Sequence, residues 1–395
     1  MFRRTTPLLL LLASLFGCSA ESAKDGSSTV PGSDGGLATD VSGGPGFDAA
    51  DPDAIYSPDG ACASRSFDGK KLPLAIALVF DQSSSMSSGG RIGIARAGIE
   101  KAFAGPTTDD VAVGLFRFGY IDGLSGCTDD TTPTFAPQPL ATGRAALFAA
   151  IDKLEASGAT PTFSALDDAY AWLKPRVASK AAPYDGKVAV VLVTDGAPTC
   201  GSHTPEEFFE LVAGGRKAGI DTFIIGLPGS GEPFYAGTGG GPPGDNPDTT
   251  AVLSKMAASG TDAASLPPSC ERDPVLSKKV TRPCYYDLES SGFSTAALAA
   301  ALDGIRKASA SCEYAMPAAN VLYDSEHPSV VIVDGKGAPH ALAQCTPGSP
   351  PPPADGCWEW ADAGKTRVRL VGGACGRVKS DDAARVDVLL ACKVR

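Results

Sequence analysis

The chain has 395 residues, which is longer than one ordinary domain. Because 43% of these residues are hydrophobic, the chain can bury a large core. The formal net charge of −11 argues against nucleic acid and against anionic lipid as binding partners. Eleven cysteines are too many for a typical cytosolic protein, and none of them forms a Cys-x-x-Cys pair that would suggest zinc. We therefore expect disulfide bonds and an oxidising compartment.

The N-terminus has the pattern of a secretory signal. Two arginines precede an apolar run from 8 to 16 that is too short to span a bilayer. The run ends at Leu-Phe-Gly-Cys18, which resembles the bacterial lipobox. The resemblance implies that residues 1–17 are removed and that an acylated Cys18 anchors the protein in the outer membrane, its only contact with a membrane. The alternative is a plain signal peptide and a secreted protein.

Residues 18–61 consist mainly of Gly, Ser, Asp, Pro and Ala and hold almost no large apolar side chain. Such a segment cannot bury enough surface to offset the entropy lost on ordering. We expect a disordered tether with an r.m.s. reach of roughly 35 Å. Its aspartates lack EF-hand spacing, so a solvated acidic linker is expected rather than a calcium site.

From Cys62 to 311, buried apolar runs alternate with amphipathic helical patterns. The predicted strands are 74–80, 111–118, 134–140, 187–195, 220–227 and 285–288. The predicted helices are 90–104, 142–157, 161–178, 205–217, 250–258 and 294–309. This alternation predicts an α/β domain with a doubly wound, mostly parallel sheet. The first strand is not followed by the Gly-rich loop that a nucleotide-binding fold needs.

Residues 312–395 have a different character, with five cysteines and two tryptophans. Short alternating stretches predict strands at 329–334, 357–360, 366–370 and 384–390, and no segment has a convincing helical pattern. We expect a small disulfide-rich β module here.

Oxygen-bearing side chains follow two of the buried strands. Asp81, Ser83 and Ser85 come directly after the first strand, Asp195 ends the strand 187–195, and Thr160 lies just before a helical pattern. Because ligands bind at the carboxyl edge of open α/β sheets, we expect these five side chains to converge. Their hard oxygen atoms suit a divalent cation, with Mg²⁺ expected first and Mn²⁺ or Ca²⁺ as alternatives.

The order Asp-x-Ser-x-Ser, then Thr, then Asp resembles the metal-ion-dependent adhesion site of the von Willebrand factor type A (vWA) domain, found in integrins and many bacterial surface proteins. The resemblance covers residues 62–311, and all five side chains match the pattern. It implies that Ser83 and Ser85 bind the metal directly and that a Glu or Asp of a protein partner fills an open position. Bacterial members usually have Gly where this chain has Ser84, a position that is not a ligand.

Two functions from different classes fit this pattern. The first is a cell-envelope lipoprotein that binds a divalent cation and, through it, a carboxylate on a protein partner, for adhesion or assembly. The alternative is a disulfide-stapled envelope scaffold whose metal site is purely structural. We expect no enzymatic activity, because the sequence has only three histidines and neither a Gly-x-Ser-x-Gly elbow nor a His-Glu-x-x-His motif.

Ten cysteines remain once Cys18 is set aside, an even number that allows five disulfides. They are Cys62, Cys127, Cys200, Cys270, Cys284, Cys312, Cys345, Cys357, Cys375 and Cys392. We predict that Cys127 pairs with Cys200, because both follow strands that end at the same sheet edge. That bridge is worth about 4 kcal/mol in the chain-entropy model. The other pairings stay open.

Overall fold

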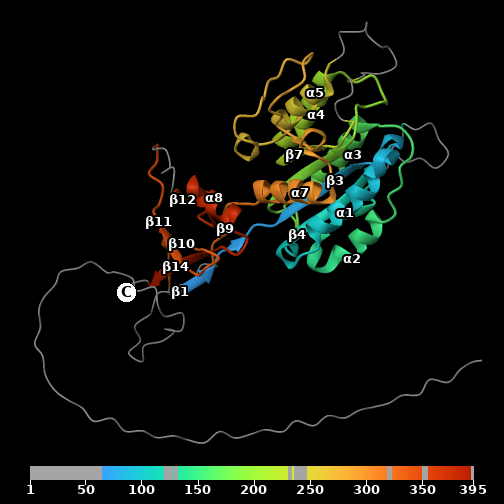
Figure 1. The fold of residues 1–395 in the computed structure, drawn as a ribbon. Coiled ribbons are helices and arrows are strands. Elements are labelled where there is room, and N and C mark those ends of the chain that lie inside the picture. The colour runs from blue at the N-terminus through green and yellow to red at the C-terminus, as the bar shows by residue number, and fades with distance from the viewer. Residues whose placement is uncertain are drawn as a thin grey trace, which may run out of the picture. The chain divides into compact units, whose positions relative to one another are not determined.

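The computed structural model describes residues 65–119, 127, 132–229, 234, 247–317, 323–348 and 355–392, which belong to one compact unit of the chain (Figure 1). The predictions for the signal segment, Cys18, the tether and Cys62 lie outside these residues, as does the side chain of Cys392. Among the described helices, none combines the length and the apolar character needed to cross a membrane.

A six-stranded, mostly parallel sheet forms the centre of the α/β region, by which we mean β3 to α7. Its strand order is β5-β4-β3-β6-β7-β8, and β5 alone runs antiparallel to its neighbour. All eight residues of β3 are buried, as expected for a strand covered on both faces. The strands are β3 (Leu74–Asp81), β4 (Val111–Phe118), β5 (Phe135–Pro139), β6 (Lys187–Thr194), β7 (Ile220–Gly226) and β8 (Tyr286–Asp287).

Helices pack on both faces of this sheet, so each face has its own apolar core (Figure 1). One face carries α1 (Arg91–Phe103), α2 (Leu140–Ile151) and α7 (Thr295–Ser309). The other carries α3 (Thr162–Ser179), α4 (Pro205–Lys217) and α5 (Thr249–Gly260). The prediction of a doubly wound, mostly parallel sheet is therefore confirmed. Shorter helices are η1 (Ser84–Gly90), η2 (Pro106–Thr108), η3 (Ala263–Ser265) and α6 (Leu288–Ser291).

One predicted helix is shorter than expected. The pattern predicts a helix over 142–157, but α2 ends at Ile151. Leu154 still lies in the core, outside the helix. The chain leaves the helix because its next residues are fastened to the end of β3: the Ser157 amide donates to the Gln82 carbonyl at 2.7 Å.

The β-rich region, by which we mean β1, β2, β9–β14 and α8, contains two four-stranded sheets of order β1-β14-β10-β11 and β12-β13-β9-β2. Strands β1 and β2 precede the α/β region yet pair with β14 and β9, so the chain passes through this region before and after the α/β region. The strands are β1 (Arg65–Asp68), β2 (Lys70–Lys71), β9 (Glu313–Ala315), β10 (Tyr323–Val333), β11 (Pro339–Leu342), β12 (Cys357–Trp360), β13 (Arg367–Val371) and β14 (Arg385–Cys392).

The expectation that this region has no helix is wrong, since α8 spans Gly373–Ser380. Ala374 and Val378 enter the apolar core, and Cys375 is bonded to Cys312. With two glycines in eight residues, the intrinsic helix propensity is low and the pattern is hard to see. Tertiary packing and the disulfide hold the helix instead.

Four disulfides are present among the described residues: Cys127–Cys200, Cys270–Cys284, Cys312–Cys375 and Cys345–Cys357. The first is the predicted pair, with its Cα atoms 5.4 Å apart. The last two lie in the β-rich region, which confirms that it is disulfide-rich.

Candidate metal site

The site begins where β3 ends. Asp81, the last residue of the strand, is completely buried, and hydrogen bonds hold both of its carboxylate oxygens. Oδ1 accepts from the backbone N–H of Ser83 at 2.8 Å, and Oδ2 accepts from the hydroxyl of Thr194 at 2.7 Å. Thr194 ends β6, the neighbouring parallel strand, so the carboxyl ends of β3 and β6 are joined through this carboxylate.

A chain of short oxygen–oxygen contacts continues from Ser83. Its hydroxyl lies 2.9 Å from that of Ser85, and the Ser85 hydroxyl donates to Oδ1 of Asp195 at 2.7 Å. Asp195 directly follows β6 and is buried, whereas Ser85 is exposed. The structure thus brings four of the five predicted residues together, and their oxygens extend from the buried end of β3 to the surface.

Thr160, the fifth predicted residue, lies in a loop that is bonded to the same strand end. The Ser84 amide and hydroxyl both donate to the Gly158 carbonyl, at 3.0 and 2.8 Å. Thr160 itself is buried, and its amide donates to the hydroxyl of Thr199 at 2.9 Å. In the part of the chain that the structure describes, no hydrogen bond joins the Thr160 hydroxyl to the other four residues.

Two glycines allow the backbone to approach this site closely. A Cβ atom on Gly119 would lie 2.7 Å from the Ser83 amide nitrogen and 2.9 Å from the carbonyl oxygen of Ala159. A Cβ atom on Gly229 would lie 2.5 Å from the carbonyl oxygen of Asp195. Both glycines have positive φ, +100° and +102°, which other residues adopt with strain.

Arg91 is a functional candidate that the sequence analysis missed. Its Nη1 donates to Oδ2 of Asp195 at 2.7 Å and to the Ser85 carbonyl at 3.3 Å. Arg91 begins α1 directly after Gly90, whose left-handed conformation turns the chain into the helix. The available signal was that Arg91 is the only Lys or Arg between Lys71 and Arg96.

The environment of Asp81 disfavours negative charge. Burial, followed by the charge of Asp195, raises the pKa of Asp81 to about 6, and the hydrogen bonds from Ser83 and Thr194 oppose this shift. With Arg91 the formal charge is −2 + 1 = −1 when both carboxylates are ionised. A cation between the carboxylates would therefore stabilise the ionised site.

The donor set fits a hard divalent cation. It offers three hydroxyls and two carboxylates, the ligand types that Mg²⁺, Mn²⁺ and Ca²⁺ prefer. The described residues hold no group of three or more His, Cys, Asp or Glu side chains placed to bind a metal ion, so this candidate depends on its hydroxyl oxygens.

One side of the site is bordered by the loop after Asp195. The Thr199 amide donates to the Thr160 carbonyl at 3.1 Å, and the Cys127–Cys200 disulfide follows. His203 stacks on Phe163, with ring centroids 3.6 Å apart. These contacts fix the loop against the start of α3.

Comparisons with known proteins give structural similarities only. No protein-family model and no curated protein sequence matches the chain. Among solved structures, the pilus adhesin SpaC of Lactobacillus rhamnosus GG is 16% identical over 84% of this chain and 41% of its own, with a TM-score of 0.42. This chain thus spans about two fifths of that adhesin.

Two further solved structures contain a metal. Manganese-loaded TRAP protein of Plasmodium vivax is 13% identical over 79% of this chain and 98% of its own, with a TM-score of 0.36. Proximal thread matrix protein 1 of the mussel byssus, with a zinc-occupied MIDAS motif, is 18% identical over 41% of this chain and 38% of its own, with a TM-score of 0.27. At this level of similarity, what these proteins bind says nothing about what this chain binds.

Proposed function

We propose that this protein is a cell-envelope binding protein with a vWA-type metal site, which captures a carboxylate on a protein partner during adhesion or assembly. The observation that carries the proposal is the path of oxygens from buried Asp81 to exposed Ser85. A partner can reach the outer end of this path, while the inner end is fixed in the sheet. The cation, Mg²⁺ by our proposal, is held by Asp81, Ser83, Ser85, Thr160 and Asp195.

The charge of the site favours an acidic partner. A divalent cation changes the formal charge of the two carboxylates and Arg91 from −1 to +1. When bound, the ion supplies positive charge and an open coordination position. Arg91 keeps Asp195 compensated through its own ion pair, so the protein's carboxylates do not neutralise the ion fully. A carboxylate from a partner restores the charge balance, whereas a neutral sugar brings no negative charge.

The disulfides support our proposal for the compartment. Four disulfides among the described residues suit an oxidising environment such as the periplasm or the cell exterior. We propose that acylated Cys18 provides the membrane anchor and that the protein has no catalytic role. Mass spectrometry of the mature N-terminus tests the anchor, since diacylglyceryl-Cys18 supports it and an unmodified N-terminus elsewhere rejects it.

The alternative, a scaffold with a structural metal, rests on a different observation. Each predicted carboxylate already has hydrogen-bond partners within the protein: Thr194 and Ser83 for Asp81, and Ser85 and Arg91 for Asp195. In this alternative, a bound ion only reinforces a hydrogen-bond network that is already complete. In that case metal would raise the melting temperature but leave partner binding unchanged.

Titration calorimetry with Mg²⁺ and Mn²⁺ tests the metal site, and capture from envelope extract tests the partner. We expect wild type to bind one ion and Asp81→Ala to bind none detectably while remaining folded. Asp152→Ala is the matched control, because Asp152 is an exposed carboxylate paired with Arg96 on another part of the surface. Captured protein that is present with Mg²⁺ and lost with EDTA supports adhesion or assembly. Metal binding with metal-independent capture supports the scaffold.

A further inference from the structure

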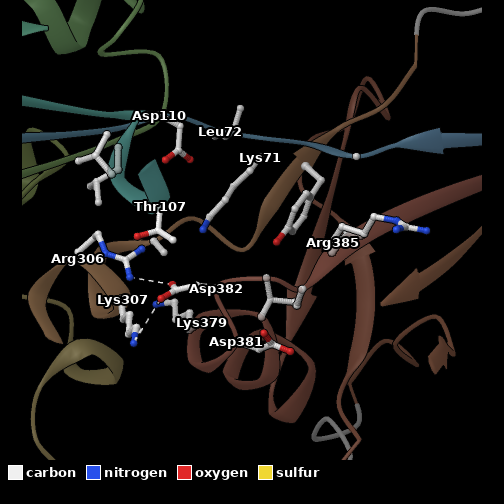
Figure 2. Close-up of a pocket in the computed structure, with 18 residues that line it drawn as sticks. Lys71, Leu72, Thr107, Asp110, Arg306, Lys307, Lys379, Asp381, Asp382 and Arg385 are labelled. Carbon is white, nitrogen blue, oxygen red and sulfur yellow. Dashed lines mark hydrogen bonds and ion pairs between the residues drawn. The ribbon is translucent and has the colours of Figure 1, made fainter. Parts of the chain in front are cut away.

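A polar cavity lies at the opposite edge of the central sheet from Asp81. It has a volume of about 420 Å³ and is lined by the first residues of β3 and β4, the end of α7, α8 and the start of β14 (Figure 2). This volume falls within the range of about 300–1,000 Å³ that is typical of ligand sites. The cavity is formed where the α/β region and the β-rich region meet within one compact unit.

Basic side chains outnumber acidic ones in the cavity lining, five to three. Three of the five basic residues are also paired with carboxylates outside the lining: Arg306 and Lys307 with Asp303, and Arg385 with Asp387. The basic residues are Lys71, Arg306, Lys307, Lys379 and Arg385, and the aspartates are Asp110, Asp381 and Asp382.

Most of the aspartate charge is already engaged. Asp382 pairs with Arg306 at 2.7 Å and with Lys307 at 3.6 Å. Asp381 accepts hydrogen bonds from backbone amides, at 2.7 Å from Gly335 and 3.0 Å from Ala383. Asp110 is exposed at the rim. Of the five lining cations, Lys71 and Lys379 are the two without a carboxylate at ion-pair distance among the described residues.

The ammonium groups of Lys71 and Lys379 differ in their remaining contacts. Lys379 donates to the Ala308 carbonyl at 2.5 Å and has no carboxylate within ion-pair distance among the described residues. For Lys71, the described residues provide neither a hydrogen bond nor an ion pair to its ammonium group, which points into the space between Asp110, Arg306 and Asp382 (Figure 2). An ammonium that is withdrawn from water needs a partner to offset its lost hydration.

Burial reduces the stability of both charges. It lowers the pKa of Lys71, and the nearby Arg306 adds to this effect while Asp110 and Asp382 oppose it. It also lowers the pKa of Lys379; the charges of Lys187 and Lys71 add to this effect, and those of Asp221 and Asp262 oppose it. The two ammonium groups are thus within electrostatic reach of one another. A negatively charged ligand between them would relieve both.

We propose that this cavity binds a small multivalent oxyanion, phosphate or sulfate, between the ammonium groups of Lys71 and Lys379. Lysine ammonium groups bind such ions as compact point charges with three donors each. Arg306 and Lys307 line the cavity beside them and are fixed by ion pairs with Asp303 and Asp382. The site is independent of the metal site, since it uses the other edge of the sheet.

Titration calorimetry with sodium phosphate and sodium sulfate, at ionic strength matched with sodium chloride, tests this site on the mature chain. We expect saturable binding of one oxyanion, with sodium acetate giving no saturable heat. The relative affinities for phosphate and sulfate identify the preferred ion. Lys71→Gln and Lys379→Gln should each weaken binding by about tenfold or more, as expected for loss of a charge-assisted hydrogen bond.

Two further variants keep the result interpretable. Lys71→Arg retains the charge and should keep binding within about threefold of wild type, a change that corresponds to well under 1.4 kcal/mol. Lys279→Gln, which removes an exposed lysine outside the cavity, should bind like wild type. The absence of saturable binding in wild type overturns the proposal. Equal affinities in wild type, Lys71→Gln and Lys379→Gln would mean an adventitious ion only and would also overturn it.

Discussion

The α/β region and the β-rich region hold their cores together by different means. In the α/β region, β3 is buried along its whole length and contributes alternate residues to two apolar cores. The β-rich region has one smaller core, built from short strands and tied by the disulfides Cys312–Cys375 and Cys345–Cys357. Each region contains two of the four disulfides among the described residues, so the difference lies in the apolar core: the first region has two large cores, and the second has one small core. The covalent links should therefore carry a larger share of the stability in the second region, as they commonly do in small domains.

The largest effect should come from the core of the α/β region. Phe80 is fully buried near the end of β3, and Phe80→Ala should lower the free energy of unfolding by about 3–5 kcal/mol, because it removes apolar contacts and leaves a cavity. Urea denaturation followed by circular dichroism measures this. A loss below about 1 kcal/mol would contradict the assignment of β3 as the central strand.

Removing either disulfide of the β-rich region should destabilise mainly that region. The Cys312–Cys375 bridge closes 63 residues and is worth about 4 kcal/mol in the chain-entropy model, compared with about 3 kcal/mol for the 12-residue Cys345–Cys357 loop. We therefore expect the double variant Cys312→Ala/Cys375→Ala to be less stable than the double variant Cys345→Ala/Cys357→Ala. Hydrogen exchange should show lost protection in β9–β14 before β3–β7. Equal loss of hydrogen-exchange protection in both regions would contradict the distinction drawn between them.

A glycine substitution tests how tightly the backbone approaches the candidate metal site. Gly119→Ala should cost about 1–3 kcal/mol, because the new Cβ meets the Ser83 amide and the residue keeps a positive φ. Gly337→Ala is the matched control, since Gly337 also has positive φ, +86°, but no atom lies within 4 Å of its Cβ position. The difference between the two isolates the contact. If the control costs as much, close packing at Ser83 is not the cause.

The smallest effect concerns the charge of the site. Arg91→Gln should tighten Mn²⁺ binding by a few fold, because it removes a positive charge from the side of Asp195. The same change should weaken capture of an acidic partner, because the occupied site loses positive charge. Calorimetry and capture on the same variant measure both effects. If metal and partner affinities change in the same direction, the charge argument fails.

The sequence predictions were more accurate for the α/β region than for the β-rich region. Strands such as β4 and β6 are continuous apolar runs, and their positions agree with prediction within a residue. The capping box at Thr204, with Pro205 next in the chain, likewise located α4. In the β-rich region, β9 and β11 have only three and four residues, too few for a clear period, and both were missed together with α8.

The site was only partly accessible from the sequence. The motif identified Asp81, Ser83, Ser85 and Asp195, which the structure brings together because β3 and β6 are parallel neighbours. Arg91 lies outside the motif, and its role depends on how η1 and Gly90 turn the chain back toward Asp195. A conformational effect of this kind has no periodic signal in the sequence.

Anomalous diffraction from crystals grown with Mn²⁺ tests the metal site most directly. We expect one strong peak at the carboxyl edge of the sheet, within roughly 2.6 Å of the hydroxyl oxygens of Ser83 and Ser85, and none in crystals of Asp81→Ala grown in the same way. A peak elsewhere in the molecule, or no peak beside these serines at saturating Mn²⁺, would contradict the account.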